Sequence, residues 1–182
     1  MSSMVIEQIV NLYEKWGHDS YSEAVSQVSH AEQAAGLARS SGSDDALVIA
    51  ALLHDVGHLL VLEATSGVPQ FDSDDNHESV GARFLANCFG NEVTAPIALH
   101  VAAKRYLCLI DSDYFATLSP ASVASLELQG GAMRRDEALR FERSPHFSKA
   151  VDLRRWDEAA KDATAKVQPF DSYITLMQSL AH

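Results

Sequence analysis

The segment at residues 46–62, ALVIAALLHDVGHLLVL, most constrains how this chain can fold. It is almost wholly apolar, and its length and spacing predict a buried helix. His54, Asp55 and His58 interrupt this apolar run. Burying three such side chains is costly unless they are paired with other groups or bound to a metal. The segment therefore predicts a core helix that also carries a functional site.

A continuous helix would place His54 and Asp55 about 100° apart around its axis. His58 would lie one turn beyond His54 on the same face. Both His54 and Asp55 can then point inward if the helix packs beside a pair of metal ions. A carboxylate can bridge two ions with its two oxygens, which an imidazole cannot do. Asp55 is therefore the candidate bridging ligand.

The rest of the chain also shows helical spacing of apolar residues, and no segment shows the alternation typical of a strand. Ser43 or Asp44 can cap the helix at residues 46–62, and Ser119-Pro120 can begin another. We expect one all-α domain over residues 1–182. The other helices are expected at residues 5–16, 25–38, 77–90, 92–107, 120–128, 134–143, 150–162 and 171–181, with a loop at residues 64–76.

Composition excludes several classes of function. The chain has 14 Lys and Arg against 25 Asp and Glu, a formal net charge of −11, which disfavours nucleic acid as a partner. No uninterrupted apolar run reaches the roughly 20 residues of a membrane helix, and the first residues do not resemble a secretory signal. Cys88 and Cys108 provide no disulfide framework. We expect a cytoplasmic enzyme without a membrane or nucleic-acid partner.

Eight histidines are spread along the chain, and four of them form a pattern with two aspartates. Imidazole and carboxylate together suit first-row metals such as iron, manganese and zinc. His18, His146 and His182 are expected at the surface or in structural roles, and the two cysteines are expected in the core. The candidate metal-binding residues are His30, His54, Asp55, His77, His100 and Asp157.

These residues resemble the signature of the HD-domain superfamily of all-helical metalloproteins. Three local motifs are more specific: HVAAKRYL at residues 100–107, LELQGGAM at 126–133 and LRRWDEAAK at 153–161. They resemble the HD-type mixed-valent diiron oxygenases that cleave carbon–phosphorus bonds. The resemblance covers roughly residues 20–162 and implies an HD-domain helical bundle that encloses a dinuclear metal site.

The resemblance implies a role for each matching residue. One iron would bind His30, His54, Asp55 and Asp157, and the other would bind Asp55, His77 and His100. His58 and Lys104 would be the catalytic groups. The substrate contacts implied by the family are Tyr21, Glu23, His58, Lys104, Ser122, Gln129 and Arg154.

Helix spacing independently supports an anion site. Lys104 lies one turn after His100, and Arg154 lies three residues before Asp157, so each cation neighbours a candidate ligand. A guanidinium can hold two oxygens of a phosphonate, and lysine supplies a point charge. Ser122 and Gln129 are one heptad apart and can share a helix face. Gly130-Gly131 follows them and would allow close backbone approach.

The resemblance also implies the reaction. A mixed-valent Fe(II)/Fe(III) pair would use O₂ to oxidise the hydroxyl-bearing carbon of a small hydroxyphosphonate. The C–P bond would break to give a carboxylic acid and phosphate. All four electrons come from the substrate, so no reductase is needed. An upstream hydroxylase would have to supply the α-hydroxyphosphonate.

The amine end of the substrate is where this sequence departs from the family. The family's oxygenase has a tyrosine three residues before the glutamate that matches Glu23, whereas Ser20 stands there and Tyr21 is displaced by one position. The loop before His77, FDSDDNH, differs as well. Aromatic and acidic residues suit a quaternary ammonium. We therefore expect 1-hydroxy-2-(trimethylammonio)ethylphosphonate as substrate, yielding glycine betaine, with 2-amino-1-hydroxyethylphosphonate, yielding glycine, as the alternative.

Two other interpretations fit part of the pattern. An HD-domain phosphohydrolase would share most of the ligands and use a metal-bound hydroxide on a phosphate ester. The residues around Lys104, Gln129 and Arg154 favour the oxygenase. A catalytically inactive HD module used for binding is the other alternative, and the presence of every ligand disfavours it.

Overall fold

A computed structural model of the chain describes residues 2–20, 24–68 and 76–182. These residues form helices, and their only β-type pairing is an isolated bridge between Phe89 and Ala181. The all-α fold class is therefore confirmed. The helices are α1 (Ser2–Trp16), α2 (Gln27–Ser40), α3 (Asp45–Leu53), α4 (Val56–Ala64), α5 (His77–Leu85), α6 (Asn91–Ile110), α7 (Ser112–Thr117), α8 (Pro120–Leu128), α9 (Arg135–Phe141), α10 (Phe147–Ala159), the 3₁₀ turn η1 (Phe170–Tyr173) and α11 (Ile174–Leu180).

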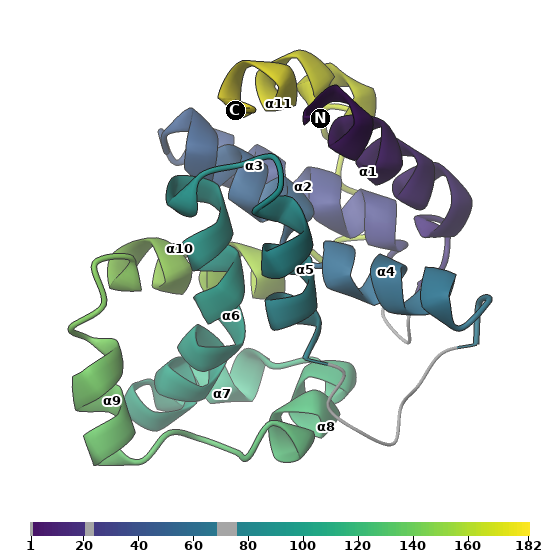
Figure 1. The fold of residues 1–182 in the computed structure, drawn as a ribbon. Coiled ribbons are helices and arrows are strands. Elements are labelled where there is room, and N and C mark those ends of the chain that lie inside the picture. Colours follow the sequence, from purple (N-terminus) through teal and green to yellow (C-terminus); the bar gives the residue numbers. More distant parts are fainter. Residues whose placement is uncertain (1, 21–23, 69–75) are drawn as a thin grey trace.

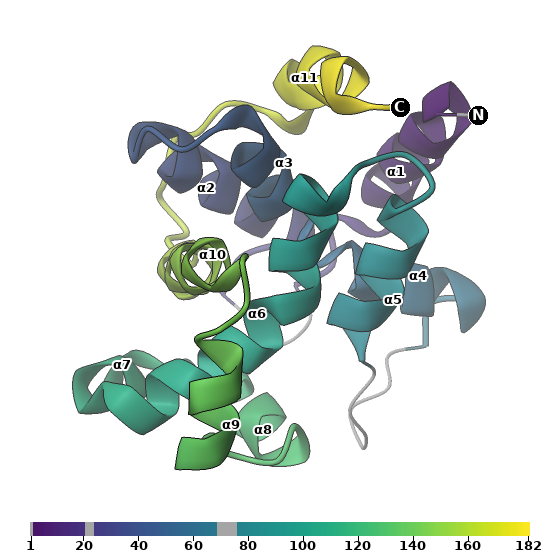
Figure 2. The ribbon, with the colours of Figure 1, turned by 60° about the vertical axis from the view of Figure 1, so that its left-hand side comes forward.

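Helices α3 and α6 occupy the middle of the bundle (Figures 1 and 2). Helix α3 packs against α2, α6 and α10, and α6 packs against α5 and α10 as well. Every residue from Leu47 to Leu53 is buried, because this helix is apolar on all sides and is enclosed on all sides. Asp44 caps its start by accepting the backbone N–H of Leu47 at 2.8 Å.

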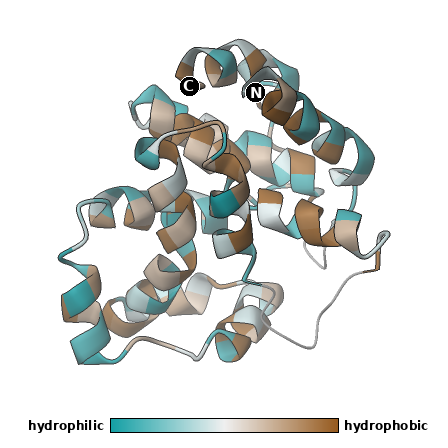
Figure 3. Ribbon diagram, viewed as in Figure 1, coloured by the Kyte–Doolittle hydropathy of each residue, from teal (hydrophilic) through white to brown (hydrophobic). Residues whose placement is uncertain are grey.

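A second, smaller core lies at the far end of α6. The C-terminal half of α6 contributes Tyr106 and Leu107, which pack with Tyr114 of α7, Phe141 of α9 and Ala150 of α10. Helix α9, at the periphery, consists mostly of hydrophilic residues (Figure 3), although its Leu139 is exposed. This smaller core holds α7 and α9 beside α6 and α10. Helices α7, α8 and α10 supply many of the polar groups described below.

The two ends of the chain lie side by side across the bundle from α8 and α9 (Figure 1). The backbone N–H of His182 donates to the carbonyl of Cys88 at 3.0 Å, and the hydroxyl of Ser2 donates to the carbonyl of His182. Helix α11 packs against α1 and α3. The ends therefore close the main core on the side away from the polar groups.

The structure differs from the sequence-based expectation at three places. The helix expected over residues 46–62 is two helices, α3 and α4, separated at His54 and Asp55. The helix expected over residues 92–107 runs from Asn91 to Ile110, with Pro96 in its second turn, so the carbonyl of Glu92 has no helical N–H to accept. Residues 112–117, left unassigned by spacing, form α7, which Asp111 caps by accepting the N–H of Tyr114 at 3.0 Å.

Two helical stretches, Asp45–Ala64 and Asn91–Ile110, are long and apolar enough to cross a membrane by length and composition alone. Most of each stretch is buried inside the bundle, as expected for core helices of a folded domain. They give no clear evidence for a membrane protein.

Helices α4 and α5 approach each other closely at two glycines. A Cβ placed on Gly57 would lie 2.0 Å from the carbonyl oxygen of His77, and one on Gly81 would lie 3.1 Å from the backbone N of Gly57. Backbone atoms cannot give way as a flexible side chain can. Because Gly57 and Gly81 have no side chains, α4 and α5 can approach closely. This close contact positions the start of α5, where His77 lies.

Gly57→Ala should lower the free energy of unfolding by about 1–3 kcal/mol, because the new methyl group overpacks the α4–α5 contact. The matched control is Gly36→Ala, also inside a helix, whose Cβ would meet only Val167 Cγ1 at 3.4 Å. That control should be neutral or stabilising by up to about 1 kcal/mol, since alanine favours helix. Urea unfolding of both variants measures the difference, and equal stability of the two would contradict the packing argument.

Candidate metal centre and anion site

The break between α3 and α4 creates the centre of the site. His54 ends α3, and Asp55 takes backbone angles of φ −99° and ψ 8° before α4 begins. The side chain of Asp55 makes no capping hydrogen bond. Its carboxylate instead lies among histidines from four helices. The carboxylate at the break between the two helices is therefore the centre of the site.

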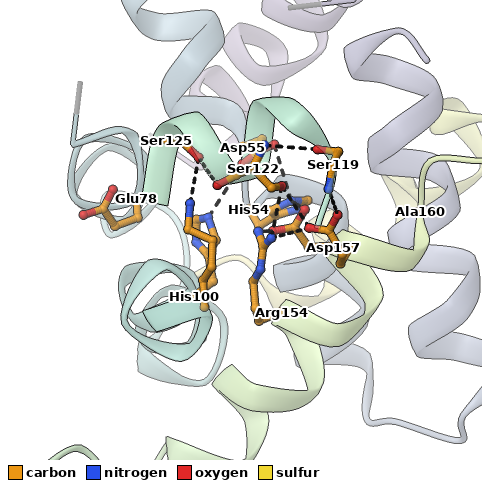
Figure 4. Close-up of polar contacts among 12 residues, drawn as sticks. His54, Asp55, Glu78, His100, Ser119, Ser122, Ser125, Arg154, Asp157 and Ala160 are labelled. Atoms are coloured by element: carbon orange, nitrogen blue, oxygen red, sulfur yellow. Dashed lines mark hydrogen bonds and ion pairs between the residues drawn. The ribbon is translucent and has the colours of Figure 1, made fainter. Parts of the chain in front are cut away.

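One set of donors faces Asp55 Oδ2. His30 Nε2 and His54 Nε2 each lie 3.5 Å from this oxygen and 3.2 Å from one another. Asp157 of α10 completes the set, with its Oδ1 at 3.2 Å from His30 Nε2 and 3.6 Å from His54 Nε2. Four donor atoms from α2, α10 and the α3–α4 break thus converge on one point (Figure 4 shows His54, Asp55 and Asp157).

A second set of donors faces the other oxygen of the same carboxylate. Asp55 Oδ1 lies 3.6 Å from His77 Nε2 and 3.8 Å from His100 Nε2, and these two nitrogens are 3.1 Å apart. His77 comes from the start of α5 and His100 from the middle of α6. Each oxygen of Asp55 therefore serves a different set of donors, as a bridging carboxylate must.

The outer nitrogens of three of these histidines are held by backbone carbonyls. Nδ1 of His30, His54 and His100 lies 2.9, 2.8 and 2.7 Å from the carbonyl oxygens of Ala160, Ala51 and Ile97, respectively. A carbonyl only accepts, so each Nδ1 must carry the proton. Each Nε2 can then present its lone pair to a metal, and the ring orientation is fixed in advance.

These donors fit a pair of metal ions. Neighbouring ligands around an octahedral ion, about 2.1 Å from it, lie about 3 Å apart, close to the separations between the Nε2 and carboxylate atoms here. Nitrogen and oxygen donors without thiolate suit iron, manganese or zinc. His58 adds a further donor beside the second set: its ring stacks on that of His77 at 3.9 Å, and Asp55, His58 and His77 could together hold an ion.

The charges at the centre are consistent with metal binding. Burial raises the pKa of Asp55, but the neighbouring His54 and His58 outweigh this effect and hold it well below its usual range. Burial lowers the pKa of His54, yet Asp55 and Asp157 raise it to about 9. Burial, together with His77 and His54, keeps the pKa of His100 well below its usual value. The carboxylates thus favour a positive charge on the facing imidazoles. A metal ion bound to the imidazole nitrogens could supply that charge in place of a proton.

Lys104 places a buried positive charge beside this centre. It lies one turn after His100 on α6, is 3% exposed, and its Nζ donates to the hydroxyl of Ser125 at 2.8 Å. No carboxylate of the described residues lies within ion-pair distance of it. Burial, followed by the nearby charge of Arg154, lowers the pKa of Lys104 to about 8. A buried ammonium with N–H groups to spare is a candidate anion-binding group.

Arg154 is also buried, but the protein already engages most of its guanidinium. Nε donates to the hydroxyl of Tyr114 at 2.6 Å, Nη1 donates to Asp157 Oδ2, and Nη2 donates to Glu158 Oε2 and to the hydroxyl of Ser122 at 3.4 Å. Figure 4 shows Arg154 between Asp157 and Ser122. These contacts use four of its five N–H groups, which leaves at most one for a substrate.

The remaining predicted site residues differ in burial, and two of them lie outside the part of the chain that the structure describes. Ser122 is buried on α8, and Gln129 is half-buried at the end of that helix, where its Oε1 is buried without a hydrogen-bond partner among the described residues. Gly130 and Gly131 both have positive φ, which glycine adopts without strain. The predicted contacts Tyr21 and Glu23 lie outside the described residues. His18 and His182 are exposed, as expected.

Three residues of the site were missed by sequence reasoning: Tyr114, Ser125 and Glu158. Tyr114 lies on a helix whose six residues are too few to show a periodic pattern. Ser125 has no distinguishing sequence signal. Glu158 directly follows Asp157 inside the motif LRRWDEAAK, so its position next to a candidate ligand could have identified it.

Asp55→Ala should abolish binding of both metal ions, because each oxygen of Asp55 faces a different set of donors. His77→Ala should deplete mainly one ion, since His77 belongs to the second set alone. His146→Ala, which changes a histidine at the start of α10 outside both donor sets, is the control and should bind normally. Elemental analysis after gel filtration measures the stoichiometry. Two ions per chain in the Asp55 variant would rule out this ligand set.

Comparison with known proteins places the chain among its relatives. The HD domain family model matches residues 28–112. The hydroxymethylphosphonate dioxygenase of Gimesia maris is 46% identical over 176 residues, which cover 95% of this chain and 88% of that protein. The (1-hydroxy-2-(trimethylamino)ethyl)phosphonate dioxygenase (glycine-betaine-forming) of Leisingera caerulea is 35% identical over 181 residues, which cover 97% of this chain and 90% of that protein.

The likeness to these relatives extends over nearly the whole chain, well beyond the residues matched by the HD domain. The resemblance seen in the sequence motifs is therefore confirmed at the level of the family. The chain belongs to the family of HD-domain oxygenases that includes these two hydroxyphosphonate dioxygenases.

Proposed function

We propose that this protein uses two iron ions, in a mixed-valent Fe(II)/Fe(III) state, to cleave the C–P bond of a 1-hydroxyphosphonate with O₂. One observation carries the proposal: the two oxygens of Asp55 face separate sets of histidines, and the buried ammonium of Lys104 lies one turn from His100. A dinuclear centre next to an anion-binding group suits a substrate whose oxidisable carbon carries a phosphonate. The family relationship favours this reaction over hydrolysis of a phosphate ester.

The reaction balances without any other reductant. A 1-hydroxyphosphonic acid, R–CH(OH)–PO₃H₂, and O₂ give R–COOH and H₃PO₄. The carbon loses its hydrogen and its bond to phosphorus, and the four electrons that reduce O₂ come from the substrate. The iron pair would supply the binding and stepwise reduction of O₂.

The residues of the chain would bind and orient the substrate. Lys104 would hold a phosphonate oxygen through its free N–H groups and so place the adjacent carbon near the metal-binding side chains. His58, half-buried and stacked on His77, would contact the substrate from α4. Ser122, Gln129 and the remaining N–H of Arg154 would contact the other oxygens. Burial of these groups limits the access of water to the reacting carbon.

The substituent R distinguishes two candidate substrates. Hydroxymethylphosphonate, in which R is hydrogen, would yield formate and phosphate. Asp55 and Asp157 belong to the donor sets, and Glu158 binds cations. Glu78, at the start of α5, has a buried Oε2 without a hydrogen-bond partner among the described residues, 3.7 Å from His77 Nδ1, so the described carboxylates do not decide between the substrates. The 46% identical relative favours hydroxymethylphosphonate. The 35% identical relative, together with Tyr21, Glu23 and the acidic run at residues 72–75 in the sequence, favours the trimethylammonio compound.

The proposed reaction also defines its biochemical setting. A 1-hydroxyphosphonate arises when an upstream oxygenase hydroxylates the carbon next to phosphorus, so such a hydroxylase is the expected functional partner. Cys88 and Cys108 are free thiols, in keeping with a reducing compartment such as the cytoplasm. We propose that the whole chain of 182 residues acts as one catalytic domain.

Aerobic incubation of the iron-loaded protein with each candidate should release phosphate, which ³¹P NMR detects. Hydroxymethylphosphonate should give a kcat/KM at least about tenfold higher than the trimethylammonio or amino compound, because the 46% identical relative is a hydroxymethylphosphonate dioxygenase. Methylphosphonate, which lacks the hydroxyl, is the control and should not react. A tenfold preference for either nitrogen compound would reverse the substrate assignment. Oxygen-independent hydrolysis of phosphate esters, with no reaction of any hydroxyphosphonate, would instead establish a phosphohydrolase.

Lys104→Met should lower kcat/KM, because a charge-assisted contact to the phosphonate is lost. The fall should correspond to a loss of about 2–4 kcal/mol in transition-state stabilisation. In the wild type, kcat/KM should fall as the pH rises through about 8, where Lys104 loses the proton that makes it cationic. Lys104→Arg stays charged at every accessible pH, so any activity it retains should lack this decline. The substrate's own ionisation is common to both proteins. Identical pH profiles would show that Lys104 is not the titrating group, and unchanged kcat/KM in Lys104→Met would place the phosphonate elsewhere.

A further inference from the structure

Glu158, in the last turn of α10, connects more of the site than any sequence signal suggested. Its side chain is 7% exposed. Oε1 accepts the backbone N–H of Ser119 at 2.9 Å and lies 3.3 Å from Lys161 Nζ, while Oε2 accepts the hydroxyl of Ser122 at 2.9 Å and an N–H of Arg154. One buried carboxylate therefore fastens the start of α8 to α10.

The contacts of Glu158 determine where Arg154 can direct its charge. Glu158 holds the Nη2 edge of the guanidinium, and Tyr114 holds Nε from the opposite side. With both edges fixed, Nη1 points at Asp157 Oδ2. A planar guanidinium held at three points cannot turn without breaking at least one charge-assisted hydrogen bond.

Asp157 is the next residue in this chain of contacts. Its Oδ2 accepts from Arg154, and its Oδ1 lies 3.2 Å from His30 Nε2 and 3.6 Å from His54 Nε2. The two oxygens thus have separate functions. If Arg154 had no second carboxylate, its whole charge would act on Asp157 and compete with a metal ion for both oxygens. Glu158 takes up part of that charge.

We infer that Glu158 is a positioning residue for the metal centre. Through Arg154 it keeps Asp157 oriented with one oxygen toward His30 and His54. It therefore controls the affinity of the first donor set for its ion without touching that ion, and it leaves the set formed by His77 and His100 unaffected. The inference rests on the proposed function in that Asp157 must be a metal ligand.

The test is Glu158→Gln, which preserves the shape of the side chain and removes its charge. Titration with Fe(II) under anaerobic conditions, against a chromophoric chelator, gives the affinity of each ion. We expect about tenfold or greater weakening for one of the two ions, the range seen when a partner of a metal ligand is changed, and normal affinity for the other. The EPR signal of the mixed-valent pair should weaken in step, while the melting temperature stays near that of the wild type.

Glu127→Gln is the matched control. Glu127 is exposed on α8, so the same chemical change there should leave both iron affinities and the EPR signal unchanged. Unchanged affinity for both ions in Glu158→Gln, or equal weakening of both, would overturn the inference. A wild-type protein that binds no iron at all would refute the proposed function instead, so the two failures are distinguishable.

A second variant covers the case in which Glu158→Gln does not fold. Glu158→Asp retains the charge but withdraws it from Arg154 by one methylene group. It should weaken the same ion selectively and less severely than the glutamine variant. Selective weakening in the folded Asp variant supports the inference, and normal binding of both ions overturns it.

Discussion

The carboxylate of Asp55, shared between two sets of histidines, is the interaction on which the rest of the structure depends. Its position requires the chain to leave one helix and enter another within an apolar segment. Leu53 and Val56, on either side of the break, are fully buried and so anchor both helix ends in the core. The other five donors come from α2, α5, α6, α10 and the end of α3. Each of those helices must therefore be fixed relative to Asp55. The packing of α2, α6 and α10 around α3 meets this requirement.

Burying so many ionisable groups is tolerable because positive and negative charges alternate. Lys161, Glu158, Arg154 and Asp157 follow one another, each within hydrogen-bond or ion-pair distance of the next. An uncompensated charge in this environment would be strongly destabilising. This series of charged side chains ends at the donor atoms of the first histidine set, where a metal cation would complete the alternation. The stability of this region and its affinity for metal are therefore coupled.

The sequence predicted the fold class and the grouping of the donors because both depend on spacing. Helical periodicity identifies α1, α2 and α5, and His30, His54 and His100 stand out as polar residues among apolar ones. The break at Asp55 could not be predicted, since apolar residues continue on both sides of His54 and Asp55 and no glycine or proline stands between the two helices. Just beyond it, Gly57 admits the backbone of α5, which is a tertiary contact. The state of Arg154 was accessible only in part: Glu158 lies four residues later on the same helix, whereas Tyr114 reaches Arg154 from α7.

Lys104 and Arg154 look equivalent in the sequence, as cations placed one turn from candidate ligands, yet the structure gives them different electrostatic environments. Arg154 contacts two carboxylates, so its charge is compensated by the protein. Lys104 contacts a serine hydroxyl and no carboxylate of the described residues. On the proposed function, an incoming phosphonate would therefore gain most from Lys104, while Arg154 would maintain the geometry of Asp157. Because every candidate substrate carries the same phosphonate and hydroxyl groups, this division of roles would serve all of them alike and leave the choice of substituent to residues at the other end of the substrate.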